Sequence, residues 1–317
     1  METTLKKHIR EINGTAQRQY IDANAVFTAL EEAINNAAEV RGGMLWKTQN
    51  GMDYLIRTTT RRGQKSLGPR TEQNEIIYRE FTARKRRVEQ RVSDLRGELE
   101  RHRKMNKIFH VGRAPEILVA ILNKLASSGL SDYFTVIGTH ALYAYEAAAG
   151  IRFEIDAALE TKDVDLLWDT RKRLSFITQM EKLDSSFLGV LRQVDSTFEL
   201  RDDQLYTAVN NHGYEVDVIR REEKNGDPHL LRLTDHEEEF YAVQAKRAGL
   251  LLDGEKFSAM IVSSTGRMAR MITISPVTYA KVKRWIATQK DRDPLKRVRD
   301  VLQAELVEEM VAEFFPN

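Results

Sequence analysis

Residues 161–168 read Thr-Lys-Asp-Val-Asp-Leu-Leu-Trp, an apolar run that contains two aspartates. Successive side chains of a β-strand point to opposite faces, so Asp163 and Asp165 share one face while Val164 and Leu166 point into a core. Aspartate is depleted in strands, and two adjacent carboxylates repel each other unless a cation lies between them. Hard divalent ions such as Mg²⁺ prefer oxygen ligands. The pattern therefore favours a metal site over a chance pair of surface charges.

A third acidic position is expected further along the chain. Residues 205–209 and 214–219 read as the two strands of a hairpin that could lie beside the first strand. The second of these strands carries Glu215 and Asp217, which share a face because they are two residues apart. The valines on both sides of Asp217 favour it as the third carboxylate, and Glu215 remains the alternative.

An anion-binding turn is expected upstream of the aspartates. Residues 133–137 read as a buried strand that runs into Gly138 and Thr139 and then into a helix over residues 141–149. A turn that opens a helix presents backbone N–H groups to an anion, here together with a hydroxyl, and the helix dipole adds to the attraction. Gly138 and Thr139 are therefore candidates for binding phosphate. The adjacent His140 either touches phosphate or caps the helix.

The first hundred residues have a different pattern. Apolar side chains at helical spacing predict a helix over about residues 19–40, and Asn50-Gly51 predicts the turn of a β-hairpin. Residues 61–71 read as a basic, flexible loop. A long helix is expected from about residue 72 to residue 107, with an apolar stripe at heptad-like spacing. The stripe consists of Ile77, Phe81, Val88, Val92, Leu95 and Leu99.

Positive charge is concentrated in this long helix. The whole chain has 49 Lys and Arg against 47 Asp and Glu, but residues 84–107 have ten basic side chains against four acidic ones. The local charge of +6 predicts a surface that contacts nucleic acid or a partner protein. The solvated face of an ordinary packed helix gives the same pattern, so both interpretations stay open.

The composition limits the chemistry and the location. The chain has 317 residues, 42% of them hydrophobic, and no cysteine. Disulfides, zinc knuckles, iron–sulfur clusters and thiol nucleophiles are therefore excluded, and the remaining metal ligands are histidine and carboxylates. A site built from aspartate selects Mg²⁺ or Mn²⁺ over zinc. No apolar run approaches the roughly 20 residues that span a bilayer, so a soluble cytoplasmic protein without a membrane partner is expected.

The order of these features resembles the polymerase-β-like nucleotidyltransferase superfamily. Its core motif is an apolar strand, Gly-Ser or a variant, then Asp-x-Asp, then one more acidic strand residue. The matching positions are Ile137-Gly138-Thr139, Asp163-Val164-Asp165 and Asp217. More narrowly, residues 138–146 and 161–167 resemble a bacterial family of nucleotidyltransferase-fold proteins, related to the minimal nucleotidyltransferases and to the abortive-infection toxin nucleotidyltransferases.

This resemblance implies an α+β fold whose nucleotidyltransferase core is a mixed β-sheet flanked by helices. The implied division is a helical N-terminal region with a β-hairpin and the long basic helix (1–110), the catalytic core (111–225), and a C-terminal hairpin and helical region that completes the nucleotide site (226–317). Two departures affect the phosphate cradle. Thr139 stands where serine is usual, and the 25 residues from Gly138 to Asp163 exceed the spacing in compact members.

The resemblance also implies a mechanism. The three aspartates would bind two Mg²⁺ ions and catalyse transfer of a nucleoside monophosphate from an NTP to an acceptor hydroxyl. Gly138-Thr139 would hold the β- and γ-phosphates. Lys283 aligns with a lysine that contacts nucleotide phosphates in related enzymes, and it would neutralise charge there.

The sequence leaves the acceptor open. Residues 84–107 favour RNA, and the toxin relatives imply the end of a transfer RNA. A small molecule or a protein is the nearest alternative acceptor. The alternative from another class is a noncatalytic nucleotide-binding or interaction protein, in which the apolar stripe of the long helix serves a partner or a homodimer.

Overall fold

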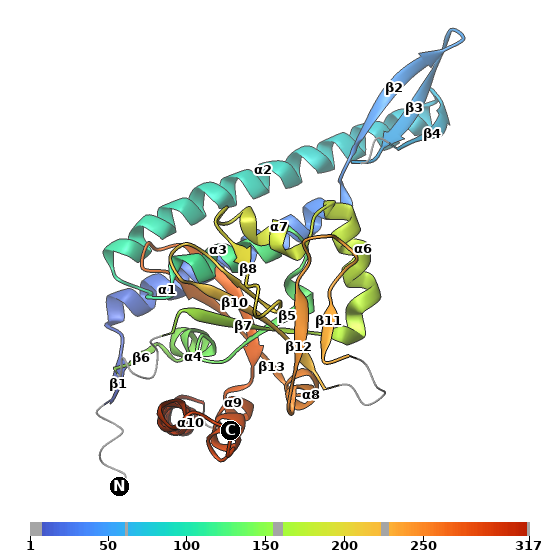
Figure 1. Ribbon diagram of the computed structural model, residues 1–317. Coiled ribbons are helices and arrows are strands. Elements are labelled where there is room, and N and C mark those ends of the chain that lie inside the picture. The colour runs from blue at the N-terminus through green and yellow to red at the C-terminus, as the bar shows by residue number, and fades with distance from the viewer. Residues whose placement is uncertain (1–7, 61–62, 155–160, 223–227, 316–317) are drawn as a thin grey trace. The chain divides into compact units, whose positions relative to one another are not determined.

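The computed structural model describes residues 8–60, 63–154, 161–222 and 228–315. The chain divides into a larger compact unit, Met1–Gln17 with Asn106–Asn317, and a smaller one, Arg18–Met105. Figure 1 labels most of the helices and strands of both units. The division expected at residues 110 and 225 stays a prediction. No helix in the described ranges has both the length and the apolar character needed to cross a membrane.

One mixed sheet forms the centre of the larger unit. Its strands, in the order in which they lie side by side, are β11 (Leu230–Arg232), β12 (Tyr241–Ala245), β10 (Glu215–Arg221), β7 (Asp163–Trp168), β5 (Phe134–Ile137), β14 (Met268–Ile274) and β13 (Lys256–Val262). The strand β9 (Thr207–Val209) pairs with the start of β10 and with β8 (Glu199–Leu200). A separate antiparallel pair joins β1 (Ile9–Glu11) to β6 (Ile151–Phe153). Both expected hairpins, β9–β10 and β13–β14, are confirmed.

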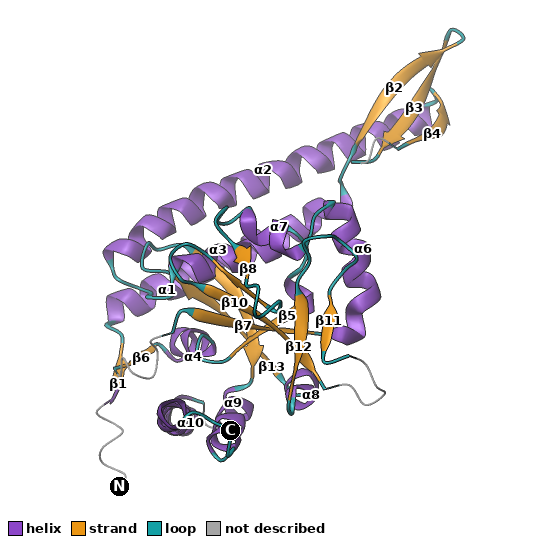
Figure 2. Ribbon diagram, in the orientation of Figure 1, coloured by secondary structure: helices purple, strands orange, loops and turns teal. Residues whose placement is uncertain are grey.

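Helices cover both faces of this sheet, as Figure 2 shows. The helices that lie mainly in one apolar core with the sheet are α3 (Glu116–Ser127), α6 (Arg173–Leu183) and α7 (Phe187–Arg192), and Ala144 also reaches this core. Those in the core on the other face are α4 (Ala141–Ala149), α8 (Ala248–Asp253), α9 (Pro276–Ala287) and α10 (Pro294–Phe314). Two short turns of 3-10 helix are η2 (Ser131–Tyr133) and η3 (Thr170–Lys172). The expected mixed sheet flanked by helices is thus confirmed.

The alternation of side chains along β7 determines which of them lie on each face of the sheet. Val164, Leu166 and Trp168 are fully buried in the core that contains α3, α6 and α7. Leu167 is buried in the core on the opposite face. Asp163 and Asp165 share the face of Leu167 because they lie two and four residues from it. The sheet therefore directs both carboxylates toward the side that carries α4, α9 and α10.

The smaller unit combines two helices with a three-stranded sheet. Its elements are α1 (Gly14–Glu39), β2 (Gly43–Gln49), β3 (Met52–Thr58), β4 (Gln64–Pro69) and α2 (Glu72–Ile108), of which α1 begins and α2 ends in the larger unit. The Asn50-Gly51 hairpin and the long helix are confirmed. Val92 and Leu95 of the predicted stripe pack against Leu30 and Ala33 of α1. The stripe therefore has a partner within the chain, and a homodimer stays a prediction.

The prediction of a loop over residues 61–71 is wrong for most of that segment. Residues 64–69 form β4, which pairs antiparallel with β3. The Ser, Gly and Pro content of this segment indicates a loop when it is read alone, but the unpaired edge of β3 supplies hydrogen-bond partners that stabilise an extended strand. Residues 61 and 62 lie outside the described residues.

Candidate active site

The sheet register brings the three predicted aspartates together. The strand β7 lies between β10 and β5, and it runs parallel to β10 with Asp165 directly beside Asp217. Asp163, Asp165 and Asp217 each offer one carboxylate oxygen, and these oxygens lie within 4.8 Å of one another. All three side chains are partly exposed, so a ligand can reach them. Such a cluster has the donor type and the spacing to hold a divalent cation.

The cluster is electrostatically strained. Burial and the charges of Asp163 and Asp217 raise the pKa of Asp165 from 3.8 to about 7, against the opposing charges of Lys283 and Arg292. Burial also raises the pKa of Asp217, although the Thr207 hydroxyl donates a hydrogen bond of 2.6 Å to its Oδ1 and opposes the shift. A bound cation would favour the ionised form of all three groups.

Glu215 does not join this cluster. Its Oε1 accepts a hydrogen bond of 2.9 Å from the Arg201 guanidinium, and the pair forms a half-buried salt bridge. The group of three carboxylates with ligand atoms in mutual reach includes Asp217 and leaves Glu215 out. The geometry therefore favours Asp217 of the two alternatives that the strand pattern left open.

Gly138 follows the last residue of β5 and lies in direct contact with Asp165 of the cluster. Its φ of +71° lies in the left-handed region, and a Cβ at this position would collide with Oδ2 of Asp165. Glycine is thus required twice, by the backbone conformation and by the close approach of the carboxylate. The turn expected to cradle phosphate and the expected metal ligands are adjacent.

Thr139 is buried, and its hydroxyl is held by Gln303, which is held in turn by Tyr279. Gln303 of α10 donates from Nε2 to the Thr139 hydroxyl at 3.1 Å, and the Tyr279 hydroxyl of α9 donates to Oε1 of Gln303 at 3.1 Å. Gln303 has no exposed surface. Because the Thr139 oxygen accepts this hydrogen bond, its own proton stays available for an acceptor such as a phosphate oxygen.

Replacing Gln303 by Leu should destabilise the fold. The change leaves the Thr139 and Tyr279 hydroxyls buried without this partner, which costs about 1–3 kcal/mol of unfolding free energy. The measurement is urea unfolding followed by circular dichroism. The control Gln73→Leu changes an exposed residue of α2 and should leave the midpoint nearly unchanged. A Gln303→Leu midpoint equal to that of the wild type would contradict the network.

Lys283 lies in a buried ionic group. Its Nζ donates to Oδ1 of Asp300 at 2.8 Å, and Nε of Arg292 donates to Oδ2 of the same carboxylate at 2.7 Å. Burial lowers the pKa of Lys283, against the opposing charges of Asp300 and Asp165. Burial would raise the pKa of Asp300, but Arg292 and Lys283 outweigh it and hold that pKa below its usual value. One carboxylate thus balances two cations, and the group keeps a positive charge that acts on Asp165.

His140 does not cap the helix, and its contact with phosphate stays a prediction. Its ring is fully buried and makes no capping hydrogen bond at the start of α4. Nε2 lies 3.3 Å from the Tyr214 hydroxyl, and burial lowers the pKa of the imidazole to about 4. The ring is therefore neutral at physiological pH, and it packs against the rings of Tyr143 and Tyr214.

Three polar residues next to the cluster were not predicted to take part in the site. They are Arg292, Asp300 and Gln303, all from the last thirty residues of the chain. Asp300 and Gln303 are one helical turn apart, which indicates a shared face of α10. A charged residue and an amide on one face usually indicate solvent contact, so only their burial reveals the role.

The pKa of Asp165 sets a pH dependence for the metal-free protein. Between 3.8 and about 7 the folded protein holds a proton on this carboxyl that the unfolded chain releases. The unfolded state then binds fewer protons, so the free energy of unfolding decreases as pH rises through this window. We expect the melting temperature in EDTA to fall across it, and less steeply in Asp165→Asn. The exposed control Asp132→Asn should keep the wild-type slope; an equally steep slope in Asp165→Asn would contradict the assignment.

The mixed sheet, the acidic cluster and the glycine turn are the features by which this chain resembles nucleotidyltransferases. A family model described as Nucleotidyltransferase matches residues 116–317, more than half of the chain, and the chain belongs to this family. No curated protein and no solved structure matches it. The matched range begins with α3 and contains every residue of the candidate site. The nucleotidyltransferase resemblance is thus confirmed, and with it the general class of transferase.

Proposed function

We propose that the protein is an Mg²⁺-dependent nucleotidyltransferase that moves a nucleoside monophosphate from an NTP to an acceptor hydroxyl. The observation that carries the proposal is the convergence of Asp163, Asp165 and Asp217 within 4.8 Å beside the Gly138 turn. The family match supports the same class of reaction.

The donor set fits a hard divalent cation. The three carboxylates repel one another, as the raised pKa of Asp165 reflects, and oxygen ligands suit Mg²⁺ or Mn²⁺. A bound ion would neutralise triphosphate charge and lower the pKa of the acceptor hydroxyl. Asp163, Asp165 and Asp217 are the residues that would hold it.

The residues of the chain have separate roles in this scheme. Asp217, oriented by the hydrogen bond from the Thr207 hydroxyl, would take the proton of the acceptor hydroxyl. The acceptor oxygen would then bond to the α-phosphorus, while the bond to the bridging oxygen breaks and pyrophosphate leaves with the electron pair. Gly138 and Thr139 would bind the β- and γ-phosphates, and Lys283 would offset their charge.

RNA is the acceptor that we propose. Arg86, Arg87 and Arg91 of α2 are exposed, and in the described part of the chain none of them has an acidic partner. Unpaired arginines on one helix favour a polyanion because each can bind phosphate through two parallel hydrogen bonds. These residues belong to the basic segment 84–107.

The direct test is transfer of label. The protein is incubated with each α-labelled NTP in turn, ATP among them, with Mg²⁺ and with separate RNA, protein and small-molecule fractions. Label in RNA that disappears in Asp163→Ala plus Asp165→Ala supports the proposal. Label in another fraction would replace RNA as the acceptor. Absence of both transfer and calorimetric NTP binding would favour the noncatalytic alternative.

A further inference from the structure

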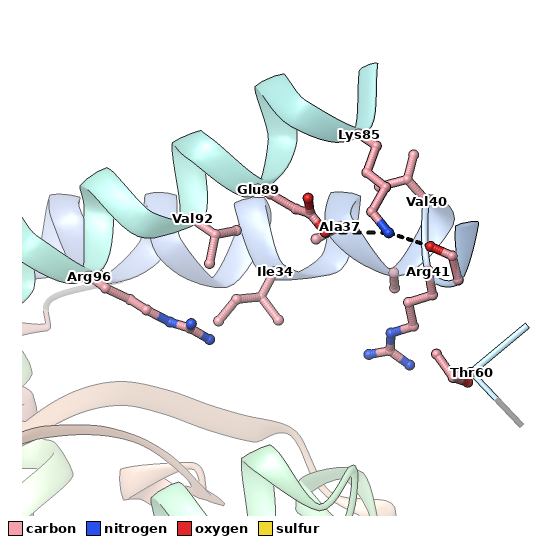
Figure 3. Close-up of a pocket in the computed structure, with 11 residues that line it drawn as sticks. Ile34, Ala37, Val40, Arg41, Thr60, Lys85, Glu89, Val92 and Arg96 are labelled. Atoms are coloured by element: carbon pink, nitrogen blue, oxygen red, sulfur yellow. Dashed lines mark hydrogen bonds and ion pairs between the residues drawn. The ribbon is translucent and has the colours of Figure 1, made fainter. Parts of the chain in front are cut away.

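The smaller unit contains a pocket of about 470 Å³ between the end of α1 and the middle of α2 (Figure 3). Its apolar part is formed by Ile34, Ala37 and Val40 from α1 and the residue that follows it, and by Val92 from α2. Ile34 is 40% exposed although it is a large apolar side chain. The volume lies in the range of small-ligand sites, which is about 300–1,000 Å³.

Three cations and one carboxylate complete the lining. Lys85 donates to the backbone oxygen of Gly42 and lies 3.5 Å from Glu89, so its charge is balanced. Arg41 and Arg96 are exposed, and within the ranges that the structure describes no side-chain hydrogen bond or ion pair engages either guanidinium. The pocket therefore carries an excess of two positive charges.

The two guanidinium groups flank the apolar part. In Figure 3 the Arg96 side chain runs toward Ile34, and Arg41 approaches from the other end of the pocket. A complementary ligand has a flat or apolar centre with an anion on each side. A nucleotide within a strand has this form, because its base lies between its own phosphate and that of the next nucleotide. Guanidinium groups suit both phosphates.

The charge of the whole unit agrees with this ligand. Residues 18–105 contain 18 Lys and Arg against 12 Asp and Glu, a net charge of +6, whereas the whole chain is at +2. An acidic peptide offers this arrangement only where an aromatic residue stands between two acidic ones, whereas every internal nucleotide of a strand carries a base between two phosphates. The combination of charge and apolar surface thus favours a nucleic acid strand.

We propose that this pocket binds one nucleotide of the acceptor RNA. Arg41 and Arg96 would contact the two adjacent phosphates, and the base would pack against Ile34 and Val92. The inference rests on the proposed function, which requires an acceptor. It assigns acceptor binding to the smaller unit and NTP binding to the larger one.

The test is fluorescence anisotropy of the full chain with a fluorescein-labelled, mixed-sequence, single-stranded 12-nucleotide RNA. Arg41→Gln plus Arg96→Gln should weaken binding at least about tenfold and lower the log–log salt slope by about 1.4, since each single-strand phosphate contact contributes about 0.7. Ile34→Asn should weaken binding without changing the slope. The matched control, Arg18→Gln plus Arg79→Gln, removes two exposed charges of the smaller unit that lie outside both the pocket and the basic segment 84–107.

The outcomes separate this inference from the proposed function. Asp165→Asn should lose nucleotidyl transfer but keep wild-type RNA affinity. If the wild type itself shows no transfer, the proposed function fails, and the binding data still test the pocket. The pocket assignment is overturned if the wild type binds no RNA. It is also overturned if the control variant loses as much affinity as the pocket variant, or if polyglutamate displaces the RNA at equal charge concentration.

Discussion

Replacing Asp165 by Asn is expected to lower the rate of nucleotidyl transfer by at least about a thousandfold. The substitution keeps the size of the side chain but removes one of the three charges that would hold the divalent cation, and metal-based stabilisation of the transition state amounts to several kcal/mol. The same change should raise the melting temperature of the metal-free protein at pH 8. Ionised Asp165 is partly buried beside two other carboxylates, so removal of its charge relieves repulsion.

A lower transfer rate together with a higher melting temperature would identify Asp165 as a metal ligand rather than a structural residue. Glu215→Gln is the matched control, because Glu215 lies two residues from Asp217 on the same strand and pairs with Arg201 instead. This control should lose little activity and little stability, as is usual for a half-exposed ion pair. Steady-state transfer rates and melting curves in EDTA and in Mg²⁺ measure both quantities. Wild-type transfer by Asp165→Asn would remove Asp165 from the site.

The acidic cluster could be predicted because its signals are local. Alternation along β7 and β10 separates the aspartates from the valines and leucines that enter the core, and this requires only the period of a strand. Asp217 lies beside Asp165 because β10 pairs with β7. The sequence left this pairing open, and the sheet register shows it. The local pattern was thus enough to select the three aspartates, and the sheet register shows that they lie together.

The support around the cluster could not be predicted because it comes from distant segments. Gln303 reaches Thr139 across 164 residues, and Asp300 is fully buried only because α9 and α10 pack against this face of the sheet. A polar residue in a helix gives no sign of burial until its neighbours are known. The strand β4 was missed for a similar reason, since its pairing with β3 outweighs its loop-like composition.

Replacing Lys283 by Met is the second change with a large expected effect. Methionine keeps the apolar stem but removes the charge that faces Asp165 and would offset the triphosphate. We expect kcat/KM for the NTP to fall about a hundredfold, the usual loss when one cationic or hydrogen-bonding group at a transferring phosphate is removed. Stability should also fall, because among the residues that the structure describes Asp300 would keep Arg292 as its one remaining ion-pair partner. Breaking a buried pair costs up to about 3–5 kcal/mol, and Arg292 reduces that loss.

The double variant Lys283→Met plus Asp300→Leu separates the two roles of the lysine. It removes the buried carboxylate together with the lysine and leaves Arg292, which is 28% exposed and can reach water. The free energy of unfolding should therefore recover in large part, while kcat/KM stays low. Lys281→Met, an exposed change on the same helix, controls for loss of charge on α9. Calorimetric NTP binding should follow kcat/KM rather than stability across the series. Recovery of transfer in the double variant would instead assign Lys283 a structural role in balancing Asp300, and phosphate binding would then rest on Gly138 and Thr139.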